Sequence, residues 1–157
     1  MTGLIVVFAV LAVATFFGLW RKRVDGRVRT VANSRRSESA PAGGVPASTF
    51  LTPRHLGEEL GTRATLVQFS SAFCQPCRAA RVILASVADE TDGVAHVEID
   101  AESHLELVRE LGIMRTPTTL ILDGSGRIAA RASGVPRKHQ VLAAINSAAD
   151  GVDAPVA

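Results

Sequence analysis

From about residue 48 onward, the apolar positions of the chain alternate between two spacings. Short apolar runs bounded by turn residues predict strands, and apolar residues that recur every three or four positions predict amphipathic helices. The predicted strands cover 48–51, 65–69, 94–99, 118–122 and 127–132. The predicted helices cover 53–61, 77–89, 103–111 and 137–149.

This alternation predicts an α/β domain over 49–149, with a mixed, mostly parallel central sheet and helices on both faces. The first helix is expected to start at Thr52-Pro53 and to stop at Gly61. Asp123-Gly-Ser-Gly, between the last two predicted strands, indicates a hairpin, so that part of the sheet should be antiparallel.

A different pattern occupies residues 4–20, which form an unbroken apolar run with Thr15 as its one conventionally polar member. As a helix this run would measure about 26 Å, just inside the lower limit for crossing a hydrocarbon core of roughly 30 Å. Trp20 and the following Arg-Lys-Arg suit the interface. We therefore predict a transmembrane helix. A buried core helix is the alternative, and it fits an apolar run ending in three cations poorly.

Charge is unevenly distributed on the two sides of this run. Residues 21–36 hold seven Lys or Arg and one acid, whereas residues 37–157 hold ten basic and fourteen acidic residues. A cleaved signal peptide would need basic residues before the run, and Met1-Thr2-Gly3 has none. The positive-inside rule places everything after Trp20 in the cytoplasm. A basic segment beside a mildly acidic domain argues for a nearby membrane and against nucleic acid as a partner.

Composition sets the remaining boundaries. Residues 37–48 are rich in Pro, Gly, Ser and Ala without apolar periodicity, which predicts a flexible linker. Together with the basic residues 21–36, the collar, they form the predicted collar and linker segment 21–48. Residues 150–157 are predicted to be a C-terminal tail. An apolar content of 47% excludes a disordered chain. Two cysteines exclude a disulfide-stapled miniprotein and an all-cysteine zinc site.

The candidate chemistry lies in Phe73-Cys74-Gln75-Pro76-Cys77, between a predicted strand and the following helix. Cysteines three positions apart in a first helical turn have Cβ atoms roughly 5–6 Å apart, so a small adjustment brings their sulfurs into disulfide range. Cys74 would also lie at the positive end of the helix dipole, which favours the thiolate, the nucleophilic form. Pro76 suits a helix start.

Two other interpretations of the cysteines are inert buried thiols and half of a metal site. Zinc would need two further ligands. The four histidines lie on separate predicted elements without ligand spacing: His55, His96, His104 and His139. A redox pair is the favoured interpretation, and neither a metal nor an organic cofactor is required.

Two separated motifs together resemble the thioredoxin family. These are Cys74-Gln-Pro-Cys77 after a hydrophobic strand and Gly112-Ile-Met-Arg-Thr-Pro117-Thr some forty residues later. The resemblance covers about 48–149 and implies a thioredoxin fold. It also implies that Pro117 is cis and faces the cysteines, that the backbone of Thr116 pairs with a substrate chain, and that Gly134 keeps the docking surface open.

The sequence departs from the usual family pattern at several positions that tune the redox pair. Phe73 stands where Trp is usual, Gln75 where Gly is usual between the cysteines, and Val82 where a helix-kinking proline is usual. Gln68 falls where typical members have a strand carboxylate that handles protons for the second cysteine. Because an amide cannot ionise, we expect the deprotonation of Cys77 to depend on water or on another base.

The resulting functional hypothesis is a membrane-tethered thiol–disulfide oxidoreductase acting on protein disulfides. Cys74 would attack the substrate and Cys77 would resolve the mixed disulfide, and a thioredoxin-reductase-like donor would restore the dithiol. One alternative keeps this chemistry but places the domain outside the cytoplasm, in cytochrome c maturation or disulfide handling. A second is a binding module without turnover, motivated by Gln68.

Overall fold

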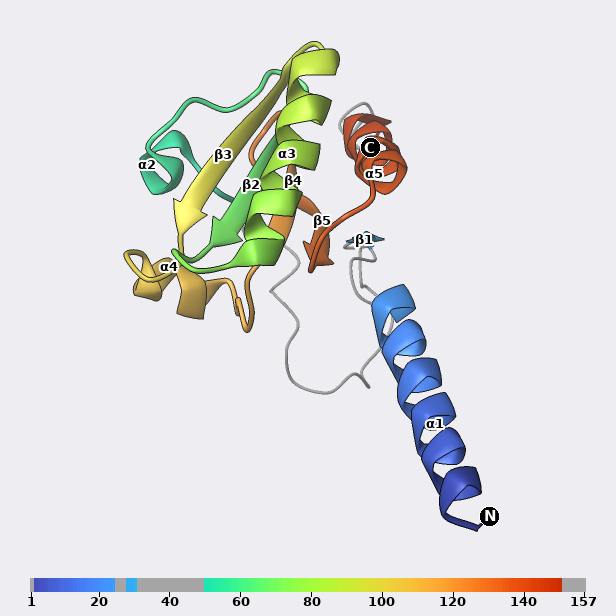
Figure 1. Ribbon diagram of the computed structural model, residues 1–157. Helices are drawn as coiled ribbons and strands as arrows, with labels where there is room; N and C mark the ends of the chain where they lie inside the picture. The colour runs from blue at the N-terminus through green and yellow to red at the C-terminus, as the bar shows by residue number, and fades with distance from the viewer. Residues whose placement is uncertain (1, 25–27, 31–49, 151–157) are drawn as a thin grey trace, which may run out of the picture.

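The computed structural model describes residues 2–24, 28–30 and 50–150 (Figure 1). Its sheet has the strand order β1-β5-β4-β2-β3. The strands are β1 (Val28–Thr30), β2 (Ala64–Ser70), β3 (Val94–Asp100), β4 (Thr118–Asp123) and β5 (Ile128–Ser133). The helices are α1 (Thr2–Val24), α2 (Pro53–Leu56), α3 (Gln75–Glu90), α4 (Leu105–Glu110) and α5 (Lys138–Asp150).

The sheet is mixed, but the prediction that it is mostly parallel was wrong. Among the strands that the structure describes, only β2 and β3 pair in parallel, through the crossover helix α3, whereas the pairs β2–β4, β4–β5 and β1–β5 are antiparallel. The alternation of helices and strands suggested successive parallel crossovers. After β3, however, the chain passes through the short helix α4, and β4 starts at the edge of the sheet where β2 ends, with Thr118 opposite Phe69, so β4 runs antiparallel to β2.

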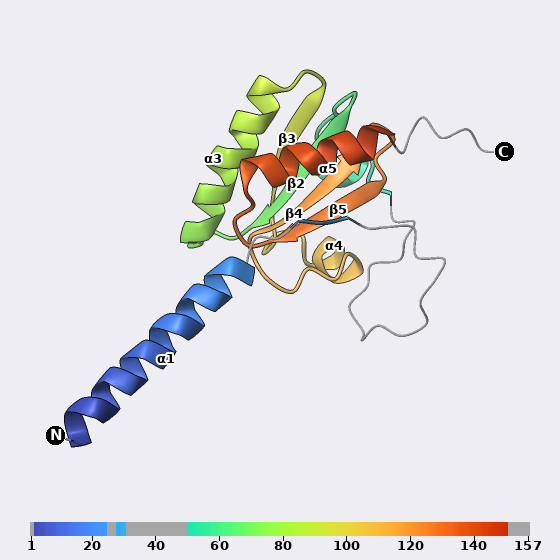
Figure 2. The ribbon, with the colours of Figure 1, turned by 90° about the vertical axis from the view of Figure 1, so that its right-hand side faces the viewer.

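The two faces of the sheet carry separate apolar clusters, because successive residues of a strand point to opposite faces. Leu66 of β2 packs in the cluster that includes Leu84 of α3 and Ile145 of α5. Its neighbours Val67 and Phe69 pack on the other face, where the cluster is completed by α2, α4 and their flanking loops. Figure 2 shows α3 and α5 on one face with α4 behind the sheet. The predicted coverage of both faces is therefore confirmed.

The helix predicted over 53–61 is shorter than expected. α2 ends at Leu56, and Gly57 follows with a left-handed φ of 72° that ends the helix. Gly61, the predicted stop, has another reason to be glycine: a Cβ there would collide with the carbonyl oxygen of Ala64. Within the described part of the predicted strand 48–51, the pairing is reduced to a bridge between Phe50 and Arg127.

A strand that the sequence did not predict lies inside the collar and linker segment. β1 pairs antiparallel with β5 in the register Val28 to Ala132 and Thr30 to Ala130, and so covers the outer side of β5. Residues 25–27 and 31–48 of the predicted collar and linker, residue 49, and residues 151–157 of the predicted tail lie outside the described residues.

The apolar N-terminal run forms a helix, as predicted. α1 covers 23 residues and projects from the domain in both views (Figures 1 and 2). Its described side chains at Val6, Phe8 and residues 10–19 are exposed. Within the parts of the chain whose side chains are described, no helix has the length and apolarity needed to cross a membrane. The transmembrane segment over 4–20 therefore stays a prediction.

Candidate active site

The two cysteines lie at the start of α3 and are joined as a disulfide, with their Cα atoms 5.2 Å apart. Cys74 is the N-cap residue, with an extended backbone, and the helix begins with Gln75 and Pro76. The backbone N–H of Cys77 donates to the Cys74 Sγ at 3.1 Å. The predicted placement of both sulfurs in one first helical turn is confirmed. An amide that points at Cys74 Sγ would also stabilise a thiolate at that position.

The two sulfur-bearing residues differ in exposure. Cys74 is partly exposed, whereas Cys77 has only 2% of its surface accessible to solvent. Both line a cleft of about 420 Å³ whose walls also include Ser70, Arg78 and Glu98. A disulfide in another molecule can therefore approach Cys74, while Cys77 is placed to react with Cys74 from within.

The loop that carries Pro117 lies beside this cleft. The Thr116–Pro117 peptide bond is cis. The Thr116 Oγ1 is 3.2 Å from the Oγ of Ser71, in the loop that leads to Cys74. Pro117 is held from the other side, because its carbonyl oxygen accepts a hydrogen bond of 2.8 Å from the N–H of Gly134. Thr116 thereby lies next to the segment that contains the cysteines. That Pro117 faces the cysteines and that the backbone of Thr116 pairs with a substrate chain stay predictions.

The family model of thioredoxin matches residues 49–147, well over half of the chain. The chain belongs to the thioredoxin family. The fold predicted from the resemblance is thus confirmed.

Individual thioredoxin relatives match parts of the chain. A thioredoxin from Alicyclobacillus acidocaldarius is 31% identical over 84 residues, which cover 53% of this chain and 79% of that protein. Human thioredoxin domain-containing protein 2 is 38% identical over 61 residues. An Arabidopsis thaliana NADPH-dependent thioredoxin reductase 3 is 45% identical over 56 residues. These two matches cover 39% and 35% of this chain, but only 11% of either relative.

Solved structures agree with the family assignment. The structure of chloroplastic thioredoxin z superposes with a TM-score of 0.51 at 27% identity, covering 57% of this chain and 81% of that one. A thioredoxin mutant from Halobacterium salinarum superposes with a TM-score of 0.50 at 19% identity, over 56% of this chain and 76% of that one, and this shows the fold alone.

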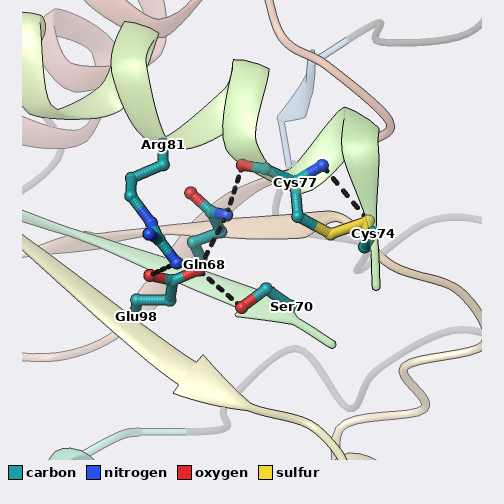
Figure 3. Close-up of polar contacts among 6 residues, drawn as sticks. All are labelled: Gln68, Ser70, Cys74, Cys77, Arg81 and Glu98. Atoms are coloured by element: carbon teal, nitrogen blue, oxygen red, sulfur yellow. Dashed lines mark hydrogen bonds and ion pairs between the residues drawn. A yellow bond between two sulfur atoms is a disulfide. The ribbon is translucent and has the colours of Figure 1, made fainter. Parts of the chain in front are cut away.

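Gln68, the most consequential departure from the thioredoxin pattern, is fully buried beneath the cysteines. Its Nε2 donates to the backbone carbonyl oxygen of Cys77 at 3.0 Å (Figure 3). The same Nε2 lies 3.4 Å from the Oε1 of Glu98 on the neighbouring strand. Gln68 therefore connects the first turn of α3 with a carboxylate of β3.

Glu98 is held by two further donors. Ser70 Oγ donates to its Oε1 at 2.6 Å, and Arg81 of α3 forms an ion pair with its Oε2 at 2.5 Å (Figure 3). Partial burial acts to raise the pKa of Glu98, but the hydrogen bonds from Arg81 and Ser70 and the charge of Arg81 outweigh it, so the pKa lies below its ordinary value. The carboxylate is consequently ionised at neutral pH.

The sequence did not single out Glu98 or Arg81 as site residues. A signal existed for each of them. The parallel register pairs Gln68 with Glu98, and Arg81 follows Cys77 by four positions, on the same side of the helix. The first signal depends on knowing which residues of two distant strands face each other, and periodicity alone does not reveal that.

The remaining predicted site residues lie around the disulfide. Phe73 is 98% exposed, and Gln75 and Pro76 are also exposed, so the three residues that flank Cys74 in the sequence are open to solvent. Met114, which precedes Pro117 by three positions, is 90% exposed. Val82, at the position of the usual kinking proline, is an exposed residue within the continuous helix α3.

Among the described residues, no group of three His, Cys, Asp or Glu side chains is arranged to hold a metal ion. The four histidines lie on different elements or at their ends: His55 on α2, His96 on β3, His104 before α4 and His139 on α5. The Nδ1 of His55 accepts a hydrogen bond from the N–H of Thr52, the residue before α2. The Nδ1 of His104 lies 3.1 Å from the carbonyl oxygen of Asp100. Burial lowers the pKa of His96, which is on β3.

Proposed function

We propose that this thioredoxin-family protein is a thiol–disulfide oxidoreductase that reduces or exchanges disulfides in other proteins. The observation that carries the proposal is the Cys74–Cys77 disulfide at the N-terminus of α3, with one residue accessible and the other buried. This asymmetry suits a two-step exchange, in which the exposed sulfur meets the substrate and the buried sulfur releases it.

The reaction starts from the dithiol form. The Cys74 thiolate attacks one sulfur of a substrate disulfide, forming a mixed disulfide and expelling the other substrate sulfur as a thiolate, which takes up a proton. Cys77 then loses its proton and attacks the Cys74 sulfur. This step forms the Cys74–Cys77 bond and releases the second substrate thiolate. The two electrons gained by the substrate come from the two cysteines of this chain.

Substrate binding is proposed at the Thr116–Pro117 segment. An extended peptide would lie along the backbone there and form strand-like hydrogen bonds. The exposed apolar side chains of Phe73, which precedes Cys74, and Met114, three positions before Pro117, support this proposal because a bound chain can contact them. Gly134, whose N–H donates to the carbonyl oxygen of Pro117, would present no side chain to the bound chain.

Continued reduction requires an electron donor that returns the disulfide to the dithiol. We assign this role to a partner that resembles thioredoxin reductase, and the reaction of the domain itself needs neither a metal nor an organic cofactor. No nucleic acid enters the scheme.

We further propose that α1 anchors the protein in a membrane, with the domain in the cytoplasm. The apolar run over 4–20 and the exposed apolar side chains of α1 support the anchor, and the basic residues after Trp20 support the orientation. Labelling of Cys74 in intact cells with an impermeant maleimide tests the side. Slow labelling is expected, and rapid labelling would favour the extracytoplasmic alternative.

Reduction of insulin disulfides by the full-length chain in mild detergent, with dithiothreitol as electron donor, tests the activity. We expect turnover from the wild type and none from Cys74→Ser. A wild-type chain that binds thiol-containing peptides but does not accelerate insulin reduction would contradict the proposal. It would favour a non-catalytic binding module, the candidate that Gln68 motivates.

A further inference from the structure

The buried thiol of Cys77 needs a route for its proton during the second step of exchange. Cys77 is 2% exposed, and its proton must leave before the sulfur can attack Cys74. Gln68, the β2 side chain that contacts the first turn of α3, cannot accept it, because an amide has no ionisable group near neutral pH. The proton must therefore go to water or to a base on another element that borders the cleft.

Two carboxylates of β3 line the same cleft as the cysteines, Glu98 and Asp100. Asp100 is engaged in its own turn, where it accepts hydrogen bonds from Ser103 Oγ at 2.5 Å and from the N–H of Glu102 at 3.0 Å. Glu98 instead lies against Gln68, which bonds directly to the Cys77 backbone. Its carboxylate is thus connected to the cysteine turn.

We propose that Glu98 accepts the proton of Cys77 through a water molecule in the cleft, and that Gln68, Ser70 and Arg81 hold its carboxylate in position. This inference rests on the proposed oxidoreductase function. In the step, the Cys77 S–H bond breaks, the water passes a proton to Glu98, and the Cys77 thiolate attacks Cys74. The proton then leaves Glu98 for the departing substrate thiolate or for solvent. No further oxidant or reductant is involved.

Other charged groups also face this region. Arg78 and Arg81 come from α3, His96 and Asp100 from β3, and β2 contributes the uncharged Gln68 and Ser70. Burial lowers the pKa of His96, so this ring is neutral near pH 7. Because Arg81 lowers the pKa of Glu98, the acceptor is ionised throughout the neutral range. It should become protonated, and the route should close, only in acid.

Stopped-flow reaction of the reduced full-length chain with the chromogenic disulfide dithiobis(nitrobenzoate) separates the two steps. Attack by Cys74 releases the first coloured thiolate, and resolution by Cys77 releases the second. The Cys77→Ser variant assigns the phases, since it lacks the second. A missing first phase in the wild type would contradict the proposed function itself, independently of Glu98.

The decisive variant is Glu98→Gln. We expect an unchanged first phase and a second phase slowed about tenfold near pH 6.5, below the range of roughly 10²–10⁴ typical of direct general-base catalysis, because water intervenes. The deficit should shrink toward about pH 9, where the thiol ionises without help. An unchanged or faster second phase would overturn the proposal; a faster one would mean that the carboxylate merely repels the thiolate.

Glu90→Gln is a matched control. Glu90 resembles Glu98 in its partners, since Ser86 Oγ donates to it at 2.7 Å and Lys138 forms an ion pair at 2.6 Å, but it lies at the opposite end of α3 from the cysteines. We expect wild-type kinetics in both phases. An equal slowing in both glutamate variants would assign the effect to general loss of an ion pair and would overturn the role of Glu98.

Arg81→Met separates proton transfer from a purely structural role. Arg81 is largely exposed, so the variant should fold, which circular dichroism would verify. Without this cation the pKa of Glu98 should rise. The fall of the second-phase rate at low pH, the acid limb of its pH profile, should therefore move to higher pH. The double variant Glu98→Gln, Arg81→Met should lack this acid limb. An acid limb that stays at the same pH in Arg81→Met would contradict the proposal.

Discussion

At the scale of single residues, the site is organised by the difference between an accessible and a buried sulfur. Cys74 is partly exposed and receives the N–H of Cys77, whereas Cys77 is enclosed and is connected through Gln68 to Glu98. The cysteine pair, Pro76 and the redox character could be predicted from the sequence, because they depend on neighbouring positions. Glu98 could not, because its proximity depends on the register of two strands thirty positions apart.

The asymmetry predicts which cysteine retains a substrate. In Cys77→Ser the first exchange still occurs on Cys74 but resolution is lost, so mixed disulfides should accumulate. Affinity purification from cells under acid quench, followed by mass spectrometry of the adducts, measures them. Cys74→Ser, the control, should accumulate few adducts because its remaining sulfur is buried. Equal trapping by the two variants would reverse the assignment of the attacking sulfur.

A buried carboxylate in the turn between β4 and β5 makes a second residue-scale prediction. Asp123 accepts hydrogen bonds from Ser125 and Arg127, including both of their backbone N–H groups. Burial acts to raise its pKa, but these bonds outweigh burial and lower it. Because the folded-state pKa lies below the unfolded value, the stabilisation is present above about pH 4 and is lost as the pH falls through the folded-state value.

Asp123→Asn should therefore lower the free energy of unfolding by about 2–3 kcal/mol at pH 7, the scale of hydrogen bonds to charged groups. The deficit should shrink at about pH 3, below the unfolded-state pKa of about 3.9, because the carboxyl of the unfolded chain is then largely protonated. Urea unfolding followed by circular dichroism at both pH values measures it. An equal deficit at the two pH values would show that the charge of Asp123 does not matter.

At the scale of elements, glycine is required for different reasons at Gly57, which follows α2, and at Gly126, which lies just before β5. Gly57 and Gly126 both have positive φ, 72° and 87°. Around Gly57 there is open space, whereas a Cβ at Gly126 would collide with the carbonyl oxygen of Leu51. The N–H of Leu51 also donates to the Gly126 carbonyl oxygen at 2.8 Å, which fixes the two backbones against each other.

This contrast predicts unequal costs for the same substitution. Gly57→Ala should cost about 1–2 kcal/mol, the penalty for a left-handed residue with a side chain. Gly126→Ala should cost clearly more, because the Leu51 segment must also move. Urea unfolding at neutral pH measures both. Equal costs would mean that the backbone contact at Gly126 adapts freely.

The sequence predicted the positions of most helices and strands in the domain but not how the strands pair. Periodicity located β2, α3, β3, β4, β5 and α5 to within a few residues, since it reflects which face of each element is buried. It could not supply strand direction, which depends on the path from β3 to β4, or the pairing of β1 with β5. It also assigned a helix stop to Gly61, a glycine required by close backbone approach, and missed the stop at Gly57.

At the scale of the whole molecule, α1 carries exposed apolar side chains that a water-facing helix would not need. Val13, near its middle, is 69% exposed. A charged residue at the centre of a membrane-crossing helix costs about 2.5–3.5 kcal/mol for insertion. Val13→Arg should therefore shift the protein from the membrane fraction to a fraction that alkaline carbonate extracts from cells, while the wild type should stay with the membranes.

Val82→Arg is the matched control, because Val82 is 70% exposed on α3 and belongs to the domain. It introduces the same side chain at the same level of exposure and should leave fractionation unchanged. Release of the wild type by carbonate would contradict the membrane anchor. Release of both valine variants would show that an added charge anywhere weakens the association. Release of Val13→Arg alone would locate the anchor in α1, so that the oxidoreductase domain acts on disulfides within reach of the membrane surface.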